Sequence, residues 1–242
     1  MGGGGGKTID PASVPNWDEA TAGTIERATS SSLPLVIVFA DEANQNSDTL
    51  MYGKDLADIS KSEAVFIKVP YTKDRTKPPQ LGESVVPQSK ILSDNQSREY
   101  KVTQYPTILV TDGNGNECMR FTKMPTAADL RSGFKRVVDT MDKANKRLSG
   151  NLETARKAWQ TKDYSKSLKA IEKNFKDGLY GLSAQEDTIR LFNEIRDSAR
   201  EEVASLKRAG DDAATKKINE IRGAFKAIDK SFAKELEGSV KK

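Results

Sequence analysis

The chain has 242 residues, of which 31% are charged and 7% aromatic, and its formal net charge is +4. This composition is typical of a soluble protein of one or two domains, and no apolar run approaches the roughly 18–20 residues of a membrane-spanning helix. The sequence contains no histidine and one cysteine, Cys118. Intrachain disulfides, Cys-His pairs, Ser-His-Asp triads and zinc sites are therefore excluded. We predict no catalytic residue, no metal and no cofactor.

The chain opens with glycines from Gly2 to Gly6, followed by Lys7 and Thr8. This order is similar to a phosphate-binding loop, but Met1 stands where the first glycine is required and no strand precedes it. Residues 1–9 are instead predicted to form a flexible leader. A sharper interpretation is the tether of a bacterial lipoprotein, with Met1 in place of the lipidated cysteine. We therefore predict an extracytoplasmic protein whose only membrane contact is that N-terminal lipid anchor.

Alternating helix and strand patterns follow the leader. Asn16–Thr29 predicts a helix capped by its first residue, with acids in its first turn. Leu33–Ala40 is almost entirely apolar, which is typical of a strand buried on both faces. A second helix is predicted from about Ser47, with a kink or break at Gly53, and Ala64–Val69 predicts the next buried strand. These patterns favour an α/β domain.

A long loop and a hairpin complete this domain. Pro70–Gln88 is rich in Pro, Lys and Gly, and it is interpreted as a solvated loop rather than a basic patch of Lys73, Arg75 and Lys77. A short helix is predicted within Ser89–Tyr100. Pro106 cannot donate to a sheet, so it must begin the next strand, and its bond to Tyr105 is predicted to be cis. Asp112–Gly115 supplies turn residues for a tight hairpin.

In this order, the tryptophan-led helix, the buried strand and the loop Tyr105-Pro106-Thr107 resemble the thioredoxin superfamily. The resemblance covers residues 10–143 and implies a thioredoxin-like α/β fold, a central mixed sheet flanked by helices. In redox-active members the first buried strand leads to a CxxC pair at a helix N-terminus, which stabilises a thiolate. The equivalent positions here are Asn44 and Ser47, which are good helix caps but cannot carry electrons. The resemblance therefore implies a redox-inactive member.

The rest of the chain, residues 144–242, is predicted to be an all-α-helical domain. A capping box opens a preceding helix over Thr126–Met141, and Gly150-Asn151 is predicted to separate two further helices. Ala158–Leu168 resembles the inner turn of one tetratricopeptide repeat, but no second copy follows, so a plain helical hairpin is favoured. Two long amphipathic helices joined at Gly210–Asp212 are then predicted to pack antiparallel.

The charge of the helical domain does not predict a nucleic-acid partner. From Asn145 onward there are 22 Lys and Arg against 16 Asp and Glu, so this part of the chain is mildly basic. The signs alternate along the sequence, as they do on solvated helices.

The fold and the missing motif together favour a non-catalytic binding protein. In the thioredoxin superfamily, the backbone beside the cis-proline pairs with an extended peptide. The corresponding groove here would be formed by Tyr105, Pro106 and Thr107 facing Ala43, Asn44 and Ser47, and its ligand would be a protein or peptide. The alternative for Pro106 is that it only shapes its loop.

Two other functions stay open at this point. Glutathione transferases also place a helical domain after a thioredoxin-like one, but no Glu-Ser or Asp-Ser pair directly follows Phe121, and only Ser47 could supply a catalytic hydroxyl. Cys118 lies mid-strand and is expected to be a buried structural thiol. The third hypothesis is a scaffold that forms a homo-oligomer or docks a partner helix through residues 185–237.

Overall fold

The computed structural model describes residues 9–47, 49–73 and 84–238. The chain divides into two compact units, which we call the sheet unit and the helical unit. The sheet unit contains Met1–Gly82 and Ser89–Met141, and the helical unit contains Glu83–Gln88 and Asp142–Lys242. Helix α4 (Ala127–Gln160) contributes residues to both units.

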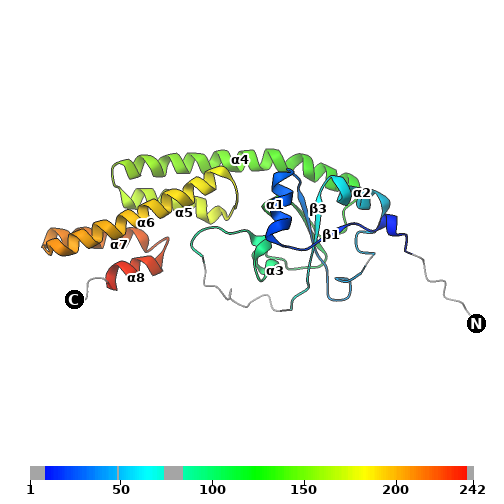
Figure 1. Ribbon diagram of the computed structural model, residues 1–242, viewed down its shortest axis with the longest axis horizontal. Coiled ribbons are helices and arrows are strands. Elements are labelled where there is room, and N and C mark those ends of the chain that lie inside the picture. The colour runs from blue at the N-terminus through cyan, green and yellow to red at the C-terminus, as the bar shows by residue number, and fades with distance from the viewer. Residues whose placement is uncertain (1–8, 48, 74–83, 239–242) are drawn as a thin grey trace, which may run out of the picture. The chain divides into compact units, whose positions relative to one another are not determined.

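The sheet unit is built on a five-stranded mixed sheet (Figure 1). Its order is β1-β3-β2-β4-β5, in which β3 is parallel to both β1 and β2, whereas β4 is antiparallel to β2 and to β5. The strands are β1 (Trp17–Asp18), β2 (Leu35–Phe39), β3 (Val65–Val69), β4 (Thr107–Thr111) and β5 (Glu117–Phe121).

Helices cover both faces of this sheet, because alternate side chains of its central strands point to opposite sides. Leu35, Ile37 and Phe39 of β2 join a core with α1 (Ala22–Ser30), and Ile91 of the 3-10 helix η2 (Lys90–Leu92) lies in the same core. The short helix α3 is Gln96–Glu99. Val36 and Val38 face the opposite core, which contains residues of α2 (Lys54–Ser62) and the start of α4. The predicted thioredoxin-like fold, with an all-helical region after it, is confirmed.

The predicted helix over residues 16–29 is wrong in its first turn. Trp17 lies in β1, opposite Phe66 of β3, and its ring makes an edge contact with the Phe66 ring at 5.8 Å between centroids. Helix α1 begins only at Ala22, where the Thr21 hydroxyl accepts a hydrogen bond from the Thr24 N–H at 3.2 Å. Partial burial of a large aromatic side chain at the sheet edge therefore outweighs the capping propensity of the residue before it.

The helix predicted from Ser47 is also wrong in its start. Residues 42–46 form turns, and α2 begins at Lys54, after Gly53. Gly53 has φ +150°, a conformation that disfavours other residues, and its N–H donates to the Ser13 carbonyl at 2.8 Å. Leu50 is nevertheless buried, as the apolar pattern indicated.

A five-residue loop joins β4 to β5 in place of the tight turn that was predicted. Asp112 organises this loop: its Oδ1 accepts the N–H groups of Asn114 and Asn116 at 3.0 and 2.8 Å. Within the loop only Gly115 has a positive φ, +85°, and its carbonyl accepts the buried Tyr100 hydroxyl at 2.7 Å. A side-chain carboxylate thus closes the loop, which explains why the turn pattern alone predicted the wrong length.

Helix α4 begins at the predicted capping box and continues beyond its predicted end. Thr126 Oγ1 and Asp129 Oδ2 exchange the capping bonds. The break predicted at Gly150-Asn151 is wrong, because the Asn151 side chain donates to Asn174 Oδ1 at 2.9 Å instead of capping a helix end. The Asn174 amide in turn donates to the Leu148 carbonyl and to Thr188 Oγ1, which ties α4 to the next two helices.

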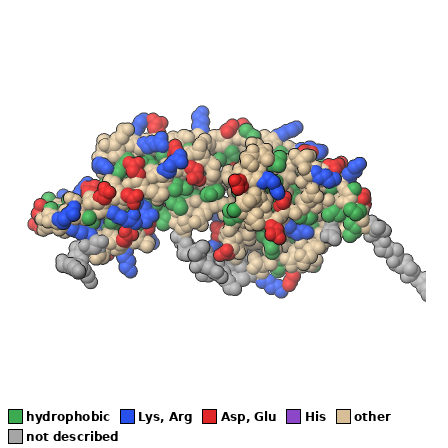
Figure 2. Space-filling view, in the orientation of Figure 1, with side chains coloured by type: hydrophobic (Ala, Val, Ile, Leu, Met, Phe, Trp, Pro, Cys, Tyr) green, Lys and Arg blue, Asp and Glu red, His purple; other side chains and the backbone are tan. Residues whose placement is uncertain are grey.

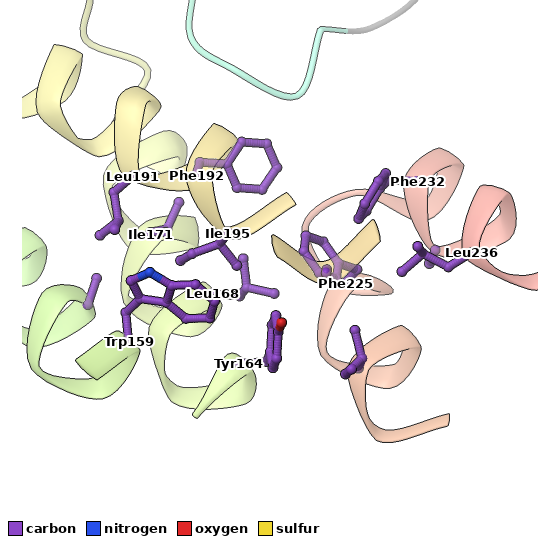
Figure 3. Close-up of a cluster of buried hydrophobic side chains, with 14 of the residues drawn as sticks. Trp159, Tyr164, Leu168, Ile171, Leu191, Phe192, Ile195, Phe225, Phe232 and Leu236 are labelled. Carbon is purple, nitrogen blue, oxygen red and sulfur yellow. The ribbon is translucent and has the colours of Figure 1, made fainter. Parts of the chain in front are cut away.

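The helical unit continues with α5 (Tyr164–Asp177), α6 (Ser183–Ala209), α7 (Asp212–Phe225) and α8 (Lys230–Gly238). Figure 3 shows its aromatic and aliphatic core, to which all of these helices contribute. The break predicted at residues 210–212 is present. The last amphipathic stripe, however, is divided between α7 and α8 rather than forming one helix.

A short segment of the chain before β4 also belongs to the helical unit. Val85 and Val86, in Glu83–Gln88, are partly buried against the core of that unit. Part of the sequence interpreted as a solvated loop therefore packs on helices. Lys73 pairs with Glu42 at 3.0 Å and is solvent-exposed, while Arg75 and Lys77 lie outside the described residues.

We predict that Gly115→Ala destabilises the sheet unit by about 2–4 kcal/mol. An added Cβ would lie 2.7 Å from the Tyr100 hydroxyl, and the φ of +85° is unfavourable for alanine. Because Trp17 and Trp159 are the two tryptophans, urea unfolding followed by fluorescence in a Trp159→Phe background reports on the sheet unit alone.

The matched control for this substitution is Gly23→Ala in α1, which lies in the same unit. A methyl group added at Gly23 would have its nearest neighbour, Thr21 Oγ1, at 4.0 Å, so alanine should raise helix stability by about 0.5–1 kcal/mol. Equal effects of the two substitutions would contradict the description of the β4–β5 loop.

Candidate functional site

A groove of about 490 Å³ lies at one end of the sheet unit, beside Pro106. Residues 40–52 follow the end of β2, and Pro106 immediately precedes β4. Because Phe39 is paired with Thr107 in the antiparallel β2–β4 ladder, these two segments must meet. Met124 and Pro125, between β5 and α4, complete the lining.

The structure places the six predicted groove residues differently. Asn44, Ser47 and Pro106 line the groove. Ala43 is exposed beside it, and Thr107 is buried, with its hydroxyl donating to the Gln104 carbonyl at 2.8 Å.

Tyr105, which is joined to Pro106 by a cis peptide bond, does not line the groove. Its ring makes an edge contact with Tyr71 at 5.3 Å between centroids and packs against the core shared with α1. The cis-proline loop therefore contributes its proline to the lining of the groove.

Asn44 and Ser47 are held by turns and not by a helix end. The Asp41 carboxylate accepts the Asn44 N–H at 2.8 Å and the Asn44 side-chain amide at 2.9 Å. The Ser47 hydroxyl lies 2.7 Å from Thr49 Oγ1. Since α2 starts at Lys54, the expected role of Asn44 and Ser47 as helix caps is wrong. Neither position is therefore at a helix N-terminus, where the pKa of a nucleophile would be lowered.

The apolar side chains of this groove were not predicted from the sequence. Tyr52 and Met124 line it while remaining 41% and 44% exposed, and Leu50, Met51 and Leu56 form deeper parts of its wall. The Tyr52 hydroxyl also accepts the Asp10 N–H at 3.0 Å. The sequence signal for them was that Tyr52 and Met124 each stand directly before a turn-forming residue, Gly53 and Pro125. This signal was overlooked because a helix was predicted to begin at about Ser47 and continue through Leu50.

The side chains that line the groove are suited to binding an apolar side chain of a ligand and do not form a catalytic arrangement. Asp41 is the charged residue among the described lining, and its carboxylate is already engaged with Asn44. Methionine side chains are flexible and polarisable, so Met51 and Met124 can adapt to ligands of different shape. The arrangement can bury an apolar anchor and exclude water around it.

Cys118 does not line the groove. Val110 pairs with Met119 and Thr111 with Glu117, which leaves Cys118 as the extra residue of a β-bulge. Its thiol is half-buried and lies 3.5 Å from the Asn116 carbonyl. Burial, followed by the charge of Asp112, raises the pKa of Cys118 to about 12. The thiol is therefore protonated at neutral pH and is a poor nucleophile.

A second hollow, of about 520 Å³, lies in the helical unit between the start of α5 and α7. Its charged residues have local partners: Asp163 caps α5, and the Lys162 amine lies 3.7 Å from the centre of the Trp159 ring. On the face drawn in Figure 2, side chains of both charge signs are interspersed over this unit. This hollow therefore indicates no particular ligand chemistry.

Neither a metal site nor a membrane span is found among the residues that the structure describes. No three His, Cys, Asp or Glu side chains of this part of the chain are grouped as a metal site would require. None of the described helices combines the length and the apolar character needed to cross a bilayer.

Comparison with known proteins gives one structural likeness. No protein-family model and no curated protein matches this chain. Among solved structures, the chain is similar to a protein described as DsbH oxidoreductase, with 15% sequence identity and a TM-score of 0.37. The match covers 53% of this chain and 92% of that one. The fold is established by the strand order of the sheet and by the packing of helices on both of its faces.

We predict that Cys118 reacts slowly with alkylating reagents in the folded protein. With its pKa raised to about 12, the thiolate fraction at neutral pH is roughly a thousand times smaller than that of an ordinary cysteine. Alkylation by iodoacetamide, followed by mass spectrometry, should be at least about tenfold slower in buffer than in denaturing urea. Equal rates would contradict the burial of this thiol.

Proposed function

We propose that the sheet unit is a non-catalytic binding domain that takes an extended protein or peptide segment into the groove beside Pro106. The observation that carries this proposal is the pair of exposed apolar side chains, Tyr52 and Met124, on a groove whose described lining contains no thiol. Exposed apolar side chains at a concave site are typical of ligand recognition. The proposal does not require a cofactor.

The lining suggests how a segment would be held. An aliphatic or aromatic side chain of the ligand would enter between Met124 and the wall formed by Leu50 and Leu56, removing apolar surface from water. Asp41 lies at the same groove, which disfavours an acidic residue of the ligand there. The ligand is therefore proposed to be apolar at its anchor and neutral or basic beside it.

The alternatives have less support. A glutathione-transferase-like reaction would need Ser47 as its hydroxyl group, and the Ser47 hydroxyl is engaged with Thr49. Self-association through the C-terminal helices stays a hypothesis without a specific supporting observation. The extracytoplasmic location and the lipid anchor also stay predictions, because residues 1–8 lie outside the described part of the chain.

The proposal is tested with a permanently unfolded basic protein as the probe, namely reduced and carbamidomethylated ribonuclease A. Met124→Glu should weaken its binding by at least about tenfold, because it replaces an apolar contact with a charge. Isothermal titration calorimetry measures the affinity.

Val138→Glu is the matched control. Val138 is 68% exposed on α4 in the sheet unit and does not line the groove, so the same change should leave binding unaltered. Cys118→Ala should also bind like the wild type. Binding that is insensitive to Met124→Glu, or absent in the wild type, would contradict the proposal.

A further inference from the structure

The C-terminal helix α8 occupies a surface of α6 and α7 in a way that resembles a bound ligand. Phe232 and Leu236, four residues apart on α8, are almost fully buried. Figure 3 shows both side chains directed toward Phe225 of α7, and the Phe225 and Phe232 rings lie 4.6 Å apart between centroids. A nine-residue helix is marginal by itself in water, so α8 depends on this surface for its structure.

Cationic side chains of α6 and α7 surround this apolar contact. Arg200 pairs with Glu235 of α8 at 2.8 Å, and Arg222 pairs with Glu237 at 2.9 Å. The Lys207 amine donates to the Leu236 carbonyl at 3.2 Å, near the negative end of the helix dipole. Arg200 also pairs with Asp197 of its own helix at 2.9 Å. The surface beneath α8 is therefore complementary to a helix that carries carboxylates at the positions of Glu235 and Glu237.

Arg222 and a further cation of α6, Arg196, are incompletely satisfied while α8 is in place. Nε of Arg196 and Nε of Arg222 are buried, and neither has a hydrogen-bond partner within the described residues. The Asp229 Oδ2 atom lies 3.7 Å from Arg196 Nε, too far for a hydrogen bond, and Asp229 Oδ1 accepts the Phe232 N–H. Buried donors without partners are unfavourable, so a helix with better-placed carboxylates would bind this surface more tightly.

We propose that the α6–α7 surface under α8 is a helix-binding groove, and that α8 is its resident occupant, displaced by an acidic amphipathic helix of a partner protein. The partner helix carries two large apolar residues four apart, with carboxylates on either side of them. This is helix-in-groove recognition, in which α8 acts as an intramolecular competitor. The inference is independent of the groove beside Pro106.

The short linker between α7 and α8 gives α8 an advantage over any free helix that competes for the groove. Residues 226–229 connect it to α7, so its effective concentration at the groove is in the millimolar range expected of short linkers. A free helix therefore binds weakly unless α8 is itself weakened. The ion pairs are partly exposed, so binding should also weaken with salt.

The test uses the full chain and a fluorescein-labelled synthetic peptide with the sequence of residues 229–238, followed by fluorescence anisotropy. Phe232→Ala with Leu236→Ala in the chain should raise peptide affinity by at least about tenfold over the wild type, because the resident helix is weakened. Raising salt from about 0.05 to about 0.5 M should lower that affinity by at least about threefold.

Two further variants separate displacement from unfolding. Glu235→Lys with Glu237→Lys in the chain removes ion pairs of α8 while leaving its apolar residues, and should also raise peptide affinity. Adding Arg196→Gln and Arg222→Gln to either variant should abolish the gain, with helical content checked by circular dichroism. A peptide with Glu235→Lys and Glu237→Lys should bind more weakly than the native sequence, because it lacks the carboxylates that pair with Arg200 and Arg222.

Peptide affinity that is the same in the wild type and in both α8-weakened variants would overturn the proposal. So would a peptide without these two glutamates that binds as tightly as the native one. A wild-type dimer in sedimentation experiments that dissociates on weakening α8, without a gain in peptide binding, would show that a second copy of this chain fills the groove instead of a partner.

Discussion

The antiparallel pairing of β2 with β4 is the constraint on which the candidate site depends. It places the end of β2 beside the start of β4, with Phe39 opposite Thr107. The chain leaving β2 and the proline entering β4 must therefore share one end of the sheet. The register itself is specified by β2, whose alternate side chains are buried in two different cores, so that a shift by one residue would exchange them.

At that end of the sheet, the chain has turns where the resemblance to redox-active thioredoxins predicted a helix N-terminus. Asp41 organises the first turn by accepting the bonds of Asn44, and α2 starts only after Gly53. The displaced helix start leaves room for Leu50 and Met51 to line a groove. Positions 44 and 47 therefore have neither cysteines nor a helix N-terminus, and a stabilised thiolate there would need both.

The fold could be predicted from the sequence because its strongest signals are long and periodic. The apolar strands, the proline before β4 and the capping box of α4 all lie where the patterns indicated. The errors arose where tertiary contacts outweigh local propensity. Trp17 joins the sheet instead of a helix, and Asn151 bonds to Asn174 instead of ending one. The Asp112 loop could not be predicted because its length depends on one side chain bonding across it.

Whether the sheet unit binds without thiol chemistry is measured by the reduction of insulin by dithiothreitol. The protein is added in catalytic amount, and the turbidity of the released B chain is followed beside a Cys118→Ala control. We expect no acceleration by either protein. Acceleration by the wild type that the Cys118→Ala variant lacks would make Cys118 a working thiol, and would contradict both its high pKa and the proposed binding role.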